Sequence, residues 1–197
     1  WDYFEGQLIP DEEEVTRVNP FEWEKAFPEV FASGAKCGFD VVIGNPPYGA
    51  NLSEAESNFL SDNYHTFGQI KDIYLCFIEK GFIVTRYDGY ISMIVPSAWT
   101  GGPAYLKLRT YLLSKKINTL LLLPFDIFSD AYIDTLIFNT SNSPPNNSDL
   151  VQAFAYPKKE KIDAIENISY QLVNQFDWKE LDNKKFIIIP ELISILS

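Results

Sequence analysis

Few of the residues from which metal sites and hydrolytic active sites are built occur in this sequence. It contains one histidine, His65, and two cysteines, Cys37 and Cys76, among 197 residues. The cysteines lack the spacing of metal ligands, and His65 lies in a polar stretch with no nucleophile or metal partner in evidence. We therefore expect no metal site and no histidine-based catalysis. So few cysteines in ordinary globular sequence are typical of a reduced, cytoplasmic protein.

Long apolar runs, a secretory leader and a glycine-rich phosphate loop are missing as well. The longest uninterrupted aliphatic run is Leu120–Leu123, whereas a helix that crosses a bilayer needs about 20 apolar residues. No charged start is followed by an apolar core and a cleavage site, so we expect neither a membrane segment nor a signal peptide. The sequence contains no GxGxxG, so a nucleotide-binding loop of that type must lie elsewhere.

Basic charge is also scarce. The sequence has 16 Lys and Arg against 27 Asp and Glu, a net charge of −11. Residues 1–31 hold nine of the acids and two basic residues, a net −7, which leaves −4 for the rest. A protein that binds DNA unaided needs a basic face for the phosphates. We expect any nucleic acid to be held mainly by segments outside this sequence, and residues 1–31 to be a solvated arm or face.

Hydrophobic residues make up 46% of the chain, which suits one globular domain with a real core. The sequence begins with WDYF, its only methionine is Met93, and it ends with IIIPELISILS. These features favour an interior piece of a longer protein. The oligomeric state cannot be inferred from them.

The apolar patterns alternate between strands and helices. They predict strands at 39–43, 90–96, 117–123 and 131–139, helices at 70–86 and 103–114, and a short helix capped by Ser53. This order indicates an α/β layer on a mainly parallel sheet. The last two strands are joined by only a few residues, so we expect them to be antiparallel neighbours, because a parallel crossover needs about a dozen.

An unusual turn follows the first predicted strand, in the stretch GFDVVIGNPPYG at residues 38–49. Ligands of open α/β sheets bind at the carboxyl ends of the strands, where this turn lies. Asn45 offers an acceptor oxygen and a donor amide. The two prolines restrict the backbone and so fix the direction of the Pro46 carbonyl. Tyr48 supplies a flat face for stacking on a planar ring.

These groups suit a planar substrate that carries an amino or amide group. The Asn45 oxygen and the Pro46 carbonyl can accept both N–H hydrogens of that group. This grip draws the nitrogen out of conjugation and frees its lone pair for attack without a strong general base. A purely structural turn is the alternative, but the position directly after an apolar strand favours a functional one.

The segment DVVIGNPPY resembles the catalytic motif of S-adenosylmethionine-dependent methyltransferases that modify adenine N6, cytosine N4 or a protein glutamine amide. Three later segments, KDIYLCF, GYISMIVPSAW and FDIFSDAYIDTLIFN, resemble in order those of the DNA adenine-N6 methyltransferases of restriction-modification systems. The likeness is closest to the Eco57I-like type II enzymes, and it covers about residues 20–140. It implies the C-terminal part of a Rossmann-like methyltransferase domain, with a mainly parallel sheet and an antiparallel last strand.

The resemblance implies which residues hold the substrate. In that family the Asn and first Pro of the motif hold the target amino group, which corresponds to Asn45 and Pro46. The aromatic residue of the motif stacks on the flipped base, which corresponds to Tyr48. A second ring packs against the base just before a late strand, and Phe128 occupies that place, although an ordinary core position is the alternative for this residue.

The resemblance also implies residues near the cofactor, S-adenosylmethionine. The family places an aromatic residue of the KDIYLCF segment against the adenine of the cofactor, which makes Phe77 the candidate. Pro47 is a second candidate for lining that pocket. A core role for Phe77 is equally compatible with its sequence. Asp72 could face the cofactor, but we favour an acid that complements the dipole of the following helix.

One departure from the family is large. The glycine-rich loop and the acids that grip the cofactor precede NPPY in the family, but only about 44 residues, without such a loop, precede it here. We divide the chain into an acidic lead-in (1–31), the catalytic half of a methyltransferase domain (32–140), a linker loop (141–149) and a C-terminal extension (150–197). That extension leads toward a target-recognition domain beyond residue 197.

The sequence therefore predicts part of a DNA adenine-N6 methyltransferase that acts on double-stranded DNA through its parent protein, with most of the cofactor pocket outside this chain. The piece is expected to be inactive by itself. A protein-glutamine or RNA methyltransferase remains an alternative within the enzymes. A degenerate scaffold domain that binds a partner through its acidic arm is an alternative outside them.

Overall fold

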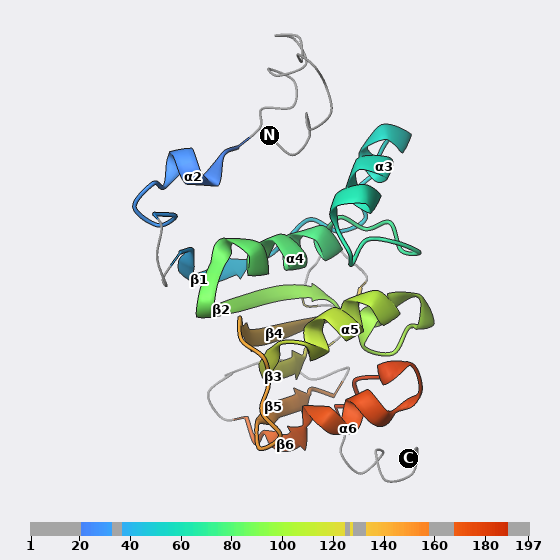
Figure 1. Cartoon of the computed structure of the whole chain (residues 1–197). Helices are drawn as coiled ribbons and strands as arrows, with labels where there is room; N and C mark the ends of the chain where they lie inside the picture. Colours follow the sequence, from blue (N-terminus) through green and yellow to red (C-terminus); the bar gives the residue numbers. More distant parts are fainter. Residues whose placement is uncertain (1–20, 33–36, 125–126, 128–132, 158–167, 189–197) are drawn as a thin grey trace.

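A computed structural model describes residues 21–32, 37–124, 127, 133–157 and 168–188. Within these ranges the chain forms a six-stranded sheet with helices packed on it (Figure 1). The strands are β1 (Phe39–Gly44), β2 (Thr85–Pro96), β3 (Lys116–Leu122), β4 (Thr135–Ser141), β5 (Leu150–Ala155) and β6 (Gln171–Asn174). The helices are α2 (Trp23–Ala26), α3 (Glu54–Asn63), α4 (Tyr74–Val84), α5 (Leu106–Leu113) and α6 (Gln175–Glu180), with short 3-10 turns η2 (Ser97–Thr100), η3 (Pro103–Tyr105) and η5 (Asp182–Lys184).

The sheet is mixed, with the strand order β1-β2-β4-β3-β5-β6. β1 is parallel to β2 and β3 is parallel to β5, whereas β4 is antiparallel to both β2 and β3, and β6 is antiparallel to β5. Four strands therefore run in one direction, and β4 and β6 run in the other. The predicted α/β class, the mainly parallel strand direction and the antiparallel pairing of β3 with β4 are confirmed.

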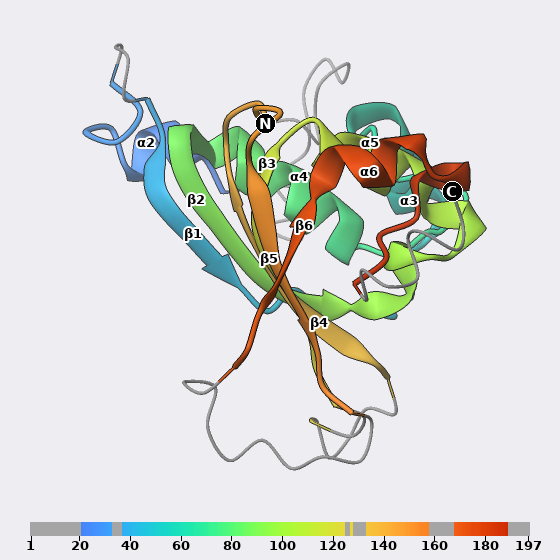
Figure 2. The ribbon, with the colours of Figure 1, turned by 90° about the horizontal axis from the view of Figure 1, so that it is seen from below.

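Helices α4, α5 and α6 lie against one face of the sheet (Figures 1 and 2). Eight of the eleven residues of α4 are buried. At Gly81 an added Cβ would lie 2.9 Å from the terminal methyl group of Met93, so this helix packs closely on β2 and a larger residue would displace that side chain. The common core also includes Trp99, Leu112 and Phe138. The helix face of the sheet thus holds the apolar interior, as the sequence pattern predicts.

Helix α2 packs at the beginning of β1. The rings of Trp23 and Phe27 meet the ring of Phe39 edge to face, with centroids 5.6 and 5.2 Å apart. Such edge-to-face pairs are favourable for aromatic rings. The described end of the acidic lead-in, residues 21–31, thus packs against the first strand, so it is not wholly the solvated arm expected from its charge.

The boundaries of α4 and β2 differ from the expected ones. Helix α4 starts at Tyr74 and ends at Val84, inside the predicted range 70–86, and β2 starts at once at Thr85. Thr85 donates its side-chain hydroxyl to the Gly81 carbonyl (2.7 Å) and also pairs with Phe39 of β1. Pairing with β1 therefore ends the helix before its apolar periodicity does. Ser53 caps α3 as predicted, in a reciprocal box with Glu56.

Strands β5 and β6 extend the same sheet beyond β3, with which β5 pairs. Val151, Ala153, Val173 and Trp178 are buried in the common core. The loop at residues 142–149 therefore joins neighbouring parts of one sheet, and the described residues after it pack with the catalytic half. No sequence pattern predicted β6, because its four residues are too few to show a period.

Candidate active site

The NPPY turn lies where the sequence predicts it, at the carboxyl end of β1. The last residue of that strand, Gly44, pairs with Met93 of the neighbouring parallel strand β2. The chain then turns through Asn45 to Gly49 and continues into α3 (Figure 1). Gly49 has φ +71°, which is a conformation that L side chains rarely adopt. The turn therefore follows directly on the sheet pairing of β1 and ends at a glycine in a left-handed conformation.

The three predicted catalytic residues differ in exposure in a way that suits their predicted roles. Asn45 is exposed, so its amide is accessible to a ligand. Pro46 is buried, which restrains the peptide that carries the second acceptor. Tyr48 is half-buried and packs against the core, so one part of its ring is supported and the other is open. An exposed amide side chain and a partly open ring therefore lie three residues apart in this turn.

The predicted cofactor residues are both exposed. Pro47 faces solvent in the turn, and the Phe77 ring on α4 has an exposed fraction of 44%. A core role for Phe77 is therefore wrong, because core rings of this chain such as Phe138 are fully buried. Both residues therefore offer exposed apolar surface, as a role in holding a ligand requires. Phe128, the predicted second ring of the base pocket, lies outside the described residues.

Asp72 meets the NPPY turn, a contact that the sequence pattern did not reveal. Both of its carboxylate oxygens lie 3.2 Å from the Gly49 nitrogen, which donates to them. Asp72 precedes α4, and its main-chain carbonyl accepts a hydrogen bond from the Leu75 nitrogen (3.2 Å). The favoured role as an acid in the first turn of the helix is wrong, because α4 begins only at Tyr74 and has no acid in its first turn; the Asp72 side chain contacts the turn 23 residues earlier instead.

A buried tyrosine follows Asp72. Tyr74 has no exposed surface, and its hydroxyl has no hydrogen-bond partner among the described residues. Burial first, and then the neighbouring Tyr105 and Asp72, raise the pKa of Tyr74 above its ordinary value. Tyr74 therefore stays neutral and adds no charge near the turn.

His65 is held by a buried carboxylate and takes no part in the turn. Its Nδ1 lies 2.9 Å from Oε1 of Glu79, whose other oxygen accepts from the nitrogen and the hydroxyl of Thr66 (both 2.9 Å). Burial alone would raise the pKa of Glu79, but these hydrogen bonds together lower it. The carboxylate thus fixes the loop between α3 and α4, and the expectation that His65 is exposed is confirmed.

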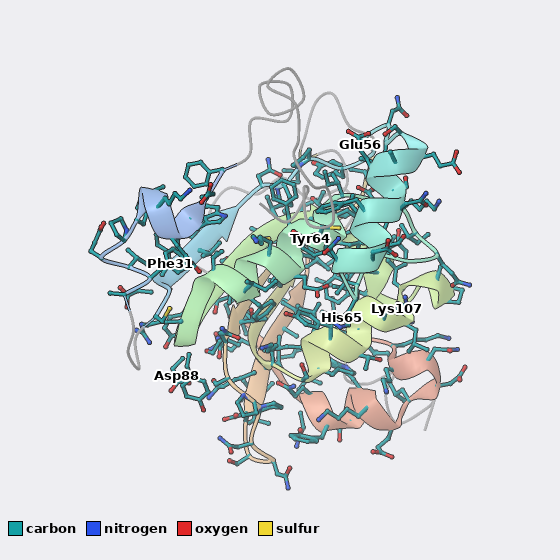
Figure 3. All side chains as sticks on the ribbon, turned by 45° about the horizontal axis from the view of Figure 1, so that its top comes forward. Phe31, Glu56, Tyr64, His65, Asp88 and Lys107 are labelled. Carbon is teal, nitrogen blue, oxygen red and sulfur yellow. The ribbon has the colours of Figure 1, made fainter. Side chains whose placement is uncertain are left out.

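A cleft of about 930 Å³ lies between the end of α3 and α5. Figure 3 labels three of its lining residues, Tyr64, His65 and Lys107. None of the described residues of the predicted site lines it, so this cleft and the NPPY turn are separate. No group of three or more His, Cys, Asp or Glu is placed to hold a metal ion within the described ranges. In the same ranges, no helix has both the length and the apolar character needed to cross a bilayer.

Comparison with known proteins identifies the family. Residues 3–128 match the Eco57I restriction-modification methylase family. The chain is 36% identical over 167 residues to RM.MjaORFECS2P of Methanocaldococcus jannaschii, whose name places it provisionally among type II restriction enzymes and methyltransferases. It is 29% identical over 110 residues to the type II restriction enzyme and methyltransferase RM.Eco57I of Escherichia coli. These matches cover 84% and 53% of this chain but only 13% and 10% of the relatives.

Solved structures show the same fold. A nuclease-deletion mutant of the Type ISP restriction-modification enzyme LlaGI, in complex with a DNA substrate mimic, matches with a TM-score of 0.58 and 14% identity, over 94% of this chain and 20% of that one. The DrdV–DNA complex matches with a TM-score of 0.52 and 13% identity, over 75% of this chain and 18% of that one. The protein therefore belongs to the Eco57I restriction-modification methylase family, as the resemblance predicted.

Proposed function

We propose that this chain carries the catalytic turn of a DNA adenine-N6 methyltransferase in a restriction-modification enzyme. The observation that carries the proposal is the turn itself: an exposed Asn45, a buried Pro46 and a half-buried Tyr48 at the carboxyl end of a parallel strand. Membership of the family supports methyl transfer. Two solved structures with a similar fold are complexes with DNA or a DNA mimic, which supports DNA as the substrate.

In this proposal the residues act on an adenine that has been flipped out of the duplex. The Asn45 oxygen and the Pro46 carbonyl accept the two N6 hydrogens, and Tyr48 stacks on the base. Phe128 packs against the base from its other side. The cofactor S-adenosylmethionine supplies the methyl group, with Pro47 and Phe77 holding its adenine. N6 gains the methyl as the sulfur–methyl bond breaks, and N6 then loses a proton to solvent.

The charge of the chain indicates that other parts of the protein hold the DNA. With a net charge of −11, this sequence cannot neutralise many phosphates. In the proposal these residues position the flipped base, whereas the duplex and most of the cofactor are bound by other segments. The isolated chain would then be inactive, or nearly so.

The decisive experiment uses the full-length protein with tritiated S-adenosylmethionine and unmethylated DNA, followed by digestion to nucleosides. We expect label in N6-methyladenine and a loss of at least about 100-fold in the Asn45→Ala variant, because a preorganised acceptor for the reacting group is removed. Asn58→Ala, which changes an exposed asparagine of α3, is the matched control and should keep full activity.

The other outcomes distinguish the alternatives. Label in RNA or in a protein glutamine amide would move the substrate to another amino-methyltransferase class, because the same grip fits either group. Absence of label in every substrate would favour a scaffold that keeps the fold without the activity.

A further inference from the structure

The NPPY turn is restrained at both of its ends. At its start, Gly44 pairs with Met93 in the sheet. At its end, the Gly49 N–H donates to both oxygens of Asp72, at 3.2 Å each. Hydrogen bonds from a backbone N–H to an ionised carboxylate are stronger than those between neutral groups. The turn between these two attachments holds Asn45 to Tyr48.

Asp72 is attached to a well-buried helix. Its carbonyl accepts from Leu75 in the first turn of α4, and most of that helix is buried against the sheet. Gly49 itself offers little other restraint, since a Cβ added there would have no neighbour within 4 Å. The carboxylate therefore fixes Gly49, which has few other contacts, relative to α4.

We propose that Asp72 is a positioning residue for the methyl-transfer site: it holds the NPPY turn in the conformation in which the acceptors of Asn45 and Pro46 converge on one amino group. This inference rests on the proposed function. A misplacement of about 1 Å at a reacting centre can reduce the rate about 100-fold. Asp72 does not contact the substrate in this account, and it acts by fixing the main chain of the turn.

A competing explanation is that Asp72 serves only as an acid near the N-terminus of α4. The two explanations differ in what an amide would do at this position. Asn retains an oxygen that can accept the Gly49 N–H, but it has no charge. The helix explanation predicts that Asp72→Asn and Asp72→Ala lose the same stability without any effect on kcat. The positioning explanation predicts that Asn largely rescues the catalytic rate and Ala does not.

The test compares these variants in the full-length protein, by kcat, KM for S-adenosylmethionine and thermal melting. We expect Asp72→Ala to lower kcat by about 10- to 100-fold, with KM changed less than about threefold. Asp72→Asn should stay within about fivefold of the wild-type kcat. Glu54→Ala, which removes an exposed acid from the first turn of α3, is the matched control and should leave kcat unchanged.

A second variant keeps the test informative if Asp72→Ala does not fold. Gly49→Ala retains the N–H and meets no neighbouring atom, but it disfavours the φ of +71° that directs the N–H at Asp72. It should also lower kcat. The double variant Gly49→Ala with Asp72→Asn should lower kcat by less than the product of the two single effects, because both changes weaken one contact.

The outcomes separate this inference from the proposed function. If the wild-type protein transfers no methyl group, both the proposed function and the positioning role are overturned. The positioning role alone is overturned if the wild type is active and Asn45→Ala is inactive, but Asp72→Ala or Gly49→Ala stays within twofold of the wild-type kcat. Equal kcat values in the Asn and Ala variants of Asp72 overturn it as well.

Discussion

Glu79 is the clearest case in which one side chain determines a local structure. Its carboxylate is nearly buried and accepts four hydrogen bonds from residues 65 and 66. The loop that these bonds fix joins α3 to α4. A carboxylate in this setting stabilises the fold only while it is ionised.

We predict that Glu79→Gln lowers the free energy of unfolding by about 1–3 kcal/mol at pH 7, because the amide cannot accept all four bonds. The pKa of Glu79 is lowered in the folded chain. Its stabilisation is therefore complete above the unfolded pKa of about 4.3 and is lost as the pH falls through the lower, folded value. Denaturant unfolding should show that the wild type and Glu79→Gln differ less in free energy of unfolding below pH 4 than at pH 7. A constant difference across this range would contradict the prediction, and Glu54→Gln is the exposed control.

At the residue scale, the sequence predicted where the NPPY turn lies, because that feature is local. Asn45 to Tyr48 are consecutive, and their position after an apolar strand is visible in the letters. The contacts of Asp72 with Gly49 and of Glu79 with His65 join residues that are 23 and 14 positions apart. No period or spacing encodes such pairs, because they depend on where two loops meet in space.

At the scale of elements, the ends of the helices were harder to predict than their existence. The apolar period of 70–86 marks a buried helix, but the pairing of Thr85 with Phe39 ends it early. The strand β6 and its place beside β5 follow from long-range pairing that four residues cannot reveal. Tertiary contacts override local preference at these boundaries.

Arg109 joins several elements at the carboxyl end of the sheet. It is fully buried on α5 and donates to the carbonyls of Trp99 and Gly102 (both 2.6 Å) and Asn183 (2.9 Å). We predict that Arg109→Lys lowers the free energy of unfolding by about 2–4 kcal/mol, because an ammonium cannot reach the three carbonyls in one geometry.

Thermal or denaturant unfolding of this variant measures the effect. Arg86→Lys is the control, since Arg86 pairs with the exposed carboxylate of Asp40 at 2.6 Å and such pairs contribute about 0–1 kcal/mol. If both variants lose the same free energy of unfolding, Arg109 stabilises the fold no more than a surface ion pair does.

At the scale of the whole molecule, the sheet is covered unequally. The described helices α4, α5 and α6 pack on one face (Figures 1 and 2), whereas apolar side chains of β1 remain exposed. Val41 and Ile43 have exposed fractions of 51% and 79%, and Tyr90, which pairs with Val41, has 48%. β1 is also the edge of the sheet in this chain. The sequence of β1 is typical of a strand buried on both faces, but the part of the chain that the structure describes leaves these side chains exposed.

We predict from this exposed face that the isolated chain self-associates and binds apolar dyes. The double variant Val41→Thr and Ile43→Thr keeps the β-branched shape while it removes apolar surface, so it should reduce association with a change in stability of about 0.5 kcal/mol or less. Sedimentation and dye fluorescence over a concentration series measure the effect. Leu172→Thr on the opposite edge strand, with an exposed fraction of 59%, is the matched control and should change association less. If the control reduces association as much as the double variant does, the exposed face of β1 is not the site of contact, and its apolar side chains need another explanation.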